Sequence, residues 1–85
     1  MIDYTKGAYY VRLSIDEFSF NGIEQYERIA CVFTHSALDA ITQVLACIDE
    51  IFDNDPYGYD LRGVSVLDGM PDRIDYEISS NMLVR

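Results

Sequence analysis

The amino-terminal part of the chain alternates apolar and polar residues with the two-residue period of a strand that has one buried face. The alternating apolar positions are Tyr9, Val11, Leu13 and Ile15. Asn21-Gly22, a pair that tolerates the positive φ angles of a type I′ turn, separates this segment from a second apolar segment. The pattern therefore predicts a hairpin that pairs residues 8–20 with residues 23–34.

A phase change interrupts the alternation within the first predicted strand. Phe18 and Phe20 alternate with each other but lie out of phase with the earlier apolar set. One extra residue near Asp16-Glu17 restores the phase, which predicts a β-bulge at that point. The cross-strand pairs predicted by this register are Phe20–Ile23, Leu13–Ile29, Val11–Cys31 and Tyr9–Phe33. One face of the hairpin then becomes almost wholly apolar, and a register slip would destroy that face.

A helical period follows the hairpin, with apolar residues three or four positions apart from Leu38 to Phe52. Ser36 is placed to cap the amino end, and Asp39 stands at the capping-box position, where a longer Glu is usual. These signals predict one helix over residues 37–53, about 25 Å long at 1.5 Å per residue. Its apolar stripe is expected to cover the apolar face of the hairpin.

Two shorter strands are predicted after the helix. The first covers residues 61–67, and the second covers residues 73–79, where apolar and charged positions alternate as in an antiparallel strand with one buried face. Its inward residues are Ile74, Tyr76 and Ile78. The pattern places no element after this strand, so residues 80–85 are expected to form a disordered tail.

This order of elements predicts an α+β fold. Residues 1–85 form a single domain with the order β-β-α-β-β. One helix packs on one face of a four-stranded, mainly antiparallel sheet, and the opposite face is left without a covering layer.

The charge balance narrows the classes of partner. Fifteen acidic residues stand against six basic ones, for a formal net charge of -9 and a sequence pI of about 4.1. Such a field repels phosphate backbones and anionic membranes and attracts basic protein surfaces. We therefore expect a basic protein surface as the partner, with no direct binding to nucleic acid or to a membrane. No apolar run approaches the roughly 20 residues of a membrane span, and no secretory signal is visible, so a cytoplasmic location is expected.

The acidic residues are densest at the end of the predicted helix and in the loop after it. The cluster comprises Asp49, Glu50, Asp53, Asp55 and Asp60, and no basic residue lies between positions 49 and 60. Each anion near the negative pole of a helix costs typically about 0.3–1 kcal/mol. A local rule broken in this way favours a functional surface; a solvated face that only aids solubility is the alternative.

Tyrosines accompany these acids. Tyr57 and Tyr59 lie in the acidic loop, while Tyr10 and Tyr26 are predicted on the outer face of the hairpin together with Glu24. Tyrosine is enriched at protein interfaces, and carboxylates interleaved with aromatic rings suit a surface rich in Arg and Lys. The candidate partner-binding residues are Asp49, Glu50, Asp53, Asp55, Tyr57, Tyr59, Asp60, Tyr10, Tyr26 and Glu24.

No pattern in the chain predicts catalysis, a metal site or a cofactor. The spacing Asp53-x-Asp55-x-x-Gly58 is like the opening of an EF-hand loop, but Tyr57 and Val64 stand where calcium ligands are required. Cys31 is predicted to face inward, where its thiol is inert, so it forms no nucleophile pair with His35. Cys31 and Cys47 fit no zinc or CxxC spacing; we expect two buried thiols, with a disulfide between them as the alternative.

Two classes of function remain. The first is a small, acidic, non-enzymatic protein-binding module, most specifically an inhibitor that blocks a basic, nucleic-acid-binding surface of its partner. Phage anti-restriction and anti-CRISPR factors include small acidic proteins of this kind, and the likeness is one of size, charge and simple architecture. The second is a homo-oligomeric structural or accessory subunit, for which a homodimer through the uncovered face or an edge strand is expected. An immunity-type protein is a further alternative.

Overall fold

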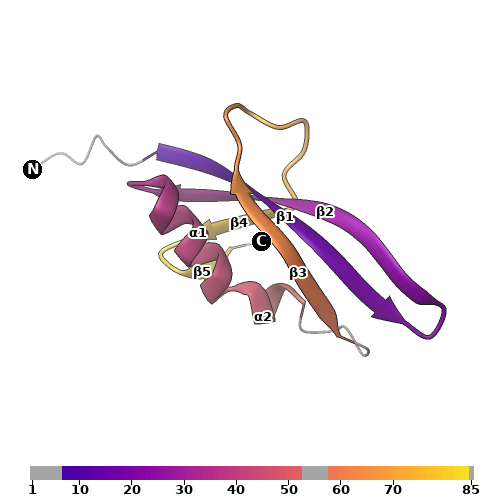
Figure 1. Cartoon of the computed structure of the whole chain (residues 1–85). Helices are drawn as coiled ribbons and strands as arrows, with labels where there is room; N and C mark the ends of the chain where they lie inside the picture. Colours follow the sequence, from indigo (N-terminus) through magenta and orange to yellow (C-terminus); the bar gives the residue numbers. More distant parts are fainter. Residues whose placement is uncertain (1–6, 53–57, 85) are drawn as a thin grey trace, which may run out of the picture.

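The computed structural model describes residues 7–52 and 58–84, which form a five-stranded mixed sheet and two short helices (Figure 1). The strands are β1 Gly7–Ser19, β2 Gly22–Thr34, β3 Tyr59–Val66, β4 Tyr76–Ser79 and β5 Met82–Leu83, and the helices are α1 Ala37–Ala46 and α2 Ile48–Ile51. The strand order is β3-β1-β2-β4-β5. The predicted α+β class is confirmed. The sheet has one strand more than predicted, and the predicted single helix is divided at Cys47.

The β1–β2 hairpin is confirmed, but its register differs from the prediction. The two strands pair without a shift from Gly7–Thr34 to Ser19–Gly22, so the bulge predicted near Asp16-Glu17 is wrong. A shift occurs instead between β1 and β3 at Ser14/Ile15, where β3 contains the extra residue. The observed register pairs Tyr9 with Val32, Val11 with Ala30, Leu13 with Arg28 and Phe18 with Ile23.

This register exchanges the two faces of β2 relative to the prediction. Residues directly opposite in an antiparallel pair share a face, so Ala30 and Val32 lie on the side covered by the helices, which we call the helix side, and Cys31 and Phe33 lie on the open face. The prediction failed here because residues 29–32 are all buried. A continuous apolar run carries no period that distinguishes one face from the other.

The type I′ turn lies elsewhere than predicted. At the β1–β2 turn the positive φ is confined to Gly22, at 125°, whereas a type I′ turn needs positive φ at both central residues. Ser80 and Asn81 meet that requirement, with φ of 53° and 63°, and they join β4 to β5. In place of the disordered tail expected for residues 80–85, the described residues up to 84 form this turn and β5.

The core lies between α1 and the helix side of the sheet. Its fully buried members come from three strands and from the helical segment: Val11, Leu13, Ile15, Ala30, Val32, Ala40, Val44, Cys47 and Ile78. Ser36 caps α1 as predicted, because its side chain accepts a hydrogen bond from the Asp39 amide at 3.1 Å. The Asp39 carboxylate does not complete a capping box; it accepts hydrogen bonds from the Thr34 hydroxyl and from Gln43 Nε2, and these lower its pKa.

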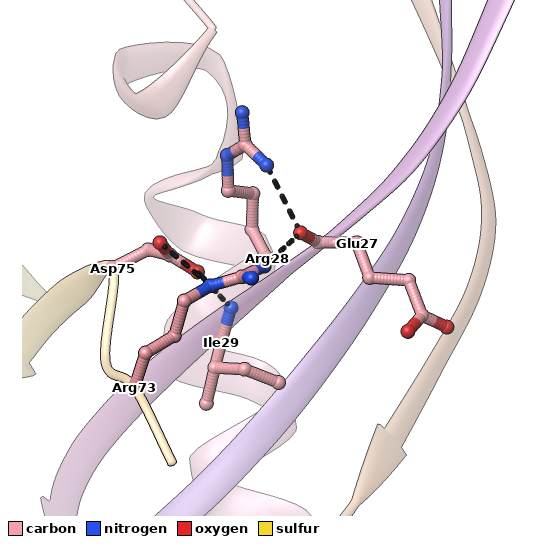
Figure 2. A network of polar contacts seen from close by, with 5 residues as sticks. All are labelled: Glu27, Arg28, Ile29, Arg73 and Asp75. Carbon is pink, nitrogen blue, oxygen red and sulfur yellow. Dashed lines mark hydrogen bonds and ion pairs between the residues drawn. The ribbon is translucent and has the colours of Figure 1, made fainter. Parts of the chain in front are cut away.

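Strand β4 runs parallel to β2, so the predicted antiparallel strand at this place is wrong. The chain leaves β2, crosses through the helices to β3 on one side of the hairpin, and returns through residues 67–75 to β4 on the other side (Figure 1). Figure 2 shows how β4 is aligned. The Asp75 carboxylate accepts from the Ile29 amide at 2.8 Å, and Arg73 contacts both Asp75 and the Glu27 carbonyl oxygen.

The hairpin is longer than the layer that covers it. At about 3.3 Å per residue, strands of 13 residues reach roughly 43 Å, whereas the ten residues of α1 reach about 15 Å. Strand β3 pairs with β1 only as far as Glu17. The hairpin end, residues 18–23, therefore projects beyond the rest of the sheet (Figure 1), and the molecule measures 53 × 22 × 19 Å.

Candidate partner-binding surface

Acidic residues gather where the hairpin leaves the sheet. Across β1 and β2, Glu17 lies directly opposite Glu24, and across β1 and β3, Asp16 lies directly opposite Asp60. Like charges in directly opposite positions destabilise a sheet, because their Cβ atoms are only about 4.5–5.5 Å apart. We call Asp16, Glu17, Glu24 and Asp60, together with Asp49 and Glu50 of α2, the acidic end.

Two of the carboxylates on β1 have side-chain partners. Arg62 forms an ion pair with Asp16. The Tyr26 hydroxyl donates to Glu17 at 2.8 Å, and the Arg28 guanidinium lies 4.2 Å from the centre of the Tyr26 ring. Burial, followed by the hydrogen bond to Glu17, raises the pKa of Tyr26. The hydroxyl therefore keeps its proton at neutral pH and continues to donate to the carboxylate.

Strand β3 connects this cluster to α2. Tyr59 stands opposite Glu17 in the β1–β3 ladder, its ring centre lies 4.5 Å from that of Phe52, and its hydroxyl donates to Asp49 at 3.4 Å. Burial and the charge of Asp49 raise the pKa of Tyr59, so this donor also stays protonated. Asp49 and Glu50 are exposed beside it, as expected for residues that bind a partner. No ion pair to Glu24, Asp49, Glu50 or Asp60 is formed within residues 7–52 and 58–84.

The acidic end is bordered by exposed apolar side chains at the hairpin end. Phe20 is 83% exposed and Ile23 is 63% exposed, although the prediction paired them on the buried face. Neither has a covering element in the described part of the chain, because Ile23 lies on the open face opposite Phe18 and Phe20 lies in the turn, beyond the reach of α1. Large exposed apolar side chains next to a charged rim are typical of an interaction site.

The structure brings six of the ten predicted site residues together at the acidic end or in contact with it: Glu24, Tyr26, Asp49, Glu50, Tyr59 and Asp60. Tyr26 and Glu24 lie on the helix side rather than on the predicted outer face. Tyr10 is on the open face as predicted, but six residues from Asp16, or about 20 Å along β1. Asp53, Asp55 and Tyr57 lie outside the described residues.

Sequence reasoning missed Asp16 and Glu17 as members of the site. It treated them as bulge residues, because the change of apolar phase at Phe18 demanded an extra residue there. The signal that would have found them is a length comparison. Two strands of 13 residues exceed the helix that is available to cover them, so the acids near the turn lie beyond the covered part of the sheet, where Asp16 and Glu17 are partly exposed.

Other acidic residues have structural partners outside the acidic end. Glu27 lies 3.8 Å from Arg12, and Asp75 lies 3.2 Å from Arg73. Cys31 and Cys47 are free buried thiols, as predicted, and burial raises the pKa of each. Residues 7–52 and 58–84 contain no group of three or more His, Cys, Asp or Glu side chains placed to hold a metal ion. Within those residues no helix has the length and apolar content needed to cross a bilayer.

Comparison with known proteins returned no similarity. No protein-family model matches the chain, and no curated protein and no solved structure matches it.

Proposed function

We propose that this chain is a small, non-enzymatic protein-binding module that uses its acidic end to bind a basic surface of another protein. In the most specific form of this proposal, it is an inhibitor that covers a nucleic-acid-binding surface. A surface that normally accepts phosphates offers Arg and Lys side chains, and the acidic end presents carboxylates to them from both faces of the sheet, with the Glu17–Glu24 pair on the helix side and the Asp16–Asp60 pair on the open face.

The observation that supports this proposal is the placement of like charges on both sides of β1. Glu24 and Asp60 each stand opposite an acid, and neither has an ion-pair partner in the described part of the chain. A basic or neutral residue at either position would stabilise the sheet. The repulsion between these acids destabilises the isolated protein, and a cationic partner would relieve it. A destabilising arrangement of this kind is expected at a binding surface.

The exposed hairpin end supplies the apolar part of the same surface. Interfaces combine aromatic anchors with a polar rim. Here the exposed Phe20 corresponds to the aromatic anchor and the acidic end to the polar rim. The partner expected from this chemistry has a basic surface around an apolar depression. The identity of the partner distinguishes the two forms of the proposal. An inhibitor would bind a nucleic-acid-binding protein, whereas an immunity-type protein would bind a toxin expressed from a neighbouring gene.

A matched pair of double variants tests the proposal. Glu24→Gln with Asp60→Asn removes two charges from the acidic end, and Asp68→Asn with Asp72→Asn removes two from the exposed β3–β4 connection. Each tagged protein is used to capture partners from a lysate of source cells, and captured proteins are identified by mass spectrometry. We expect the first variant to lose the partner that the wild type and the second variant retain.

Two follow-up measurements define the mode of binding. Affinity for the identified partner should fall as salt rises, because the screening length shrinks from about 10 Å at 0.1 M to about 3 Å at 1 M. Nucleic acid should compete for the partner if the inhibitor form of the proposal is correct. Equal losses in both double variants would show that only net charge matters, and unchanged capture in both would remove the acidic end from consideration.

A further inference from the structure

The outer edge of β3 is unpaired by any strand in the described part of the chain. Strand β3 is the first strand in the sheet order, and its eight residues, Tyr59–Val66, pair only with β1. Natural edge strands are protected by charged side chains, above all Lys, by Pro, by β-bulges or by shortness, and in β3 the charges and the bulge are confined to the first half, at Asp60 to Arg62. This edge has no Lys and no Pro, and its second half, Gly63 to Val66, carries no charge. The other edge, by contrast, is the two-residue β5.

Apolar side chains continue from this edge onto the helix. Leu61, Val64 and Val66 are only half-buried against the core, because no further strand of the described residues flanks them. On α1, Leu38 is 75% exposed and Leu45 is 45% exposed, and Ile41 lies between them at helical spacing. Gln43, on the opposite flank of α1, accepts a hydrogen bond from the Asn81 amide at 3.0 Å beside β5, so Ile41 is on the flank toward β3, and Leu38 and Leu45 lie between that flank and the outer surface of the helix.

We propose that β3 pairs antiparallel with β3 of a second copy, which continues the sheet across a two-fold axis and brings the exposed flanks of the two α1 helices toward each other. The pattern of β3 is self-complementary in one register, which sets Tyr59 opposite Val66 and Leu61 opposite Val64 of the second copy. All four are on the helix side, so the pairing joins apolar side chains on one face. A two-fold pair uses the same patch on both copies, which closes the assembly at a dimer.

The placement of the acids agrees with this occupant, and the two Arg62 residues, which come close to the two-fold axis, each keep the ion pair with Asp16 of their own chain. In the proposed register Asp60 lies opposite Ser65 of the second copy, and the two Asp60 residues are five positions apart, or about 17 Å along the strand direction. That separation exceeds the screening length of about 8 Å at physiological ionic strength. The two acidic ends therefore lie at opposite ends of the interface, where a net charge of -9 per chain opposes association least.

Introducing charges of opposite sign at Ser65, in two separate variants, tests both the dimer and its register. Mass is measured by sedimentation and light scattering over a range of protein concentrations, and the expected value is twice the 9.7 kDa of one chain. Ser65→Asp faces Asp60 of the second copy twice in each dimer, and Ser65→Lys offers it an opposite charge. Ser65 also stands opposite Arg12 of its own chain, but that contact is the same in the single chain and in the dimer, so it largely cancels in the dissociation constant. From the size of cross-strand charge effects, we expect the dissociation constant to rise for the first variant and to fall for the second, each by roughly 2- to 30-fold.

Gln25→Asp and Gln25→Lys are the matched controls, since Gln25 is exposed on β2 outside the proposed interface. They change net charge equally and should leave the dissociation constant within about twofold of wild type. Leu38→Glu, at an exposed helix position that tolerates an acid, should weaken the dimer without unfolding the chain. Circular dichroism verifies folding of every variant.

A mass of one chain at all concentrations would overturn the proposal, and so would a dimer on which both Ser65 variants act in the same direction. The dimer should strengthen as salt screens the repulsion between copies, whereas partner binding through the acidic end should weaken. The two salt responses have opposite signs. Measuring dimer formation and partner binding over the same series of salt concentrations therefore distinguishes failure of the dimer from failure of the proposed function.

Discussion

Single polar residues in this protein serve two different purposes. Asp75 belongs to the fold: its amide donates to the Ile29 carbonyl oxygen at 2.8 Å, and its carboxylate accepts from the Ile29 amide at 2.8 Å. One side chain thus continues the β2–β4 ladder by one residue before β4 begins. Within residues 7–52 and 58–84, Glu24 and Asp60 have no such partners. This difference separates acids that stabilise the sheet from acids that destabilise it.

Removal of the Asp75 carboxylate should therefore destabilise the fold. Asp75→Ala leaves the largely buried Ile29 amide without an acceptor and breaks the contact with Arg73, for an expected loss of about 1–3 kcal/mol in the free energy of unfolding. Asp75→Asn keeps one acceptor oxygen and should lose less. Urea titration measures both. Asp72→Ala, at an exposed acid of the same connection, should change stability by less than about 0.5 kcal/mol; a similar loss there would contradict the assigned role of Asp75.

At the scale of elements, the β4–β5 turn has a backbone that its residues do not favour. Ser80 and Asn81 hold φ of 53° and 63°, a region that costs most non-glycine residues roughly 1–2 kcal/mol. The surroundings hold the turn in place. Gln43 accepts from the Asn81 amide, and the Cys47 thiol donates to the Asn81 carbonyl oxygen at 3.4 Å. The buried Gln43 is thus satisfied by a turn that no local sequence signal predicted.

Replacement of Ser80-Asn81 by Asn-Gly, the pair most favoured in type I′ turns, should stabilise the protein by about 0.5–1 kcal/mol. The contacts to Gln43 and Cys47 use Asn81 backbone atoms, so they survive the change. Thermal unfolding followed by circular dichroism measures the gain. Asn21→Gly is the control, because Asn21 does not have a positive φ and glycine there only adds freedom to the unfolded chain. An equal gain at Asn21 would refute the explanation.

The elements that sequence predicted well are those with a clear period. The β1 face of Val11, Leu13 and Ile15, and the α1 stripe that includes Val44, follow directly from spacing. The face of β2 did not follow, because residues 29–32 are buried on both sides and contain no alternation. Likewise β4 alternates in the same way whether it pairs parallel or antiparallel, and only the crossing of residues 67–75 decides its direction.

At the scale of the whole molecule, the sequence predicted an acidic candidate surface but not its position in the fold. Composition indicated the acidic character of that surface, and the local density of acids and tyrosines singled out Asp49, Tyr59 and Asp60, whose role in binding stays a prediction. The contribution of Asp16 and Glu17 depends on register across three strands, which fixes which acids face one another. The two surfaces proposed here have different physical bases, one charged at the end of the hairpin and one apolar along β3, so each can be altered separately.

If repulsion within the acidic end destabilises the fold, then removing part of that repulsion must raise the free energy of unfolding of the isolated protein. Glu24→Gln with Asp60→Asn removes one acid from each like-charged pair and leaves the Tyr26–Glu17 and Arg62–Asp16 contacts intact. At roughly 0.2–1 kcal/mol for each pair, we expect a gain of about 0.4–2 kcal/mol in low salt.

That gain should shrink as salt is added, because wild type recovers the same free energy by screening. Asp68→Asn with Asp72→Asn changes the net charge equally but relieves no directly opposed pair, so its gain should be smaller at every salt concentration. Urea midpoints at several salt concentrations measure all three proteins. Identical gains in the two double variants would mean that the strain is spread over the whole charge of the chain, and that the facing acids of β1, β2 and β3 have no special part in it.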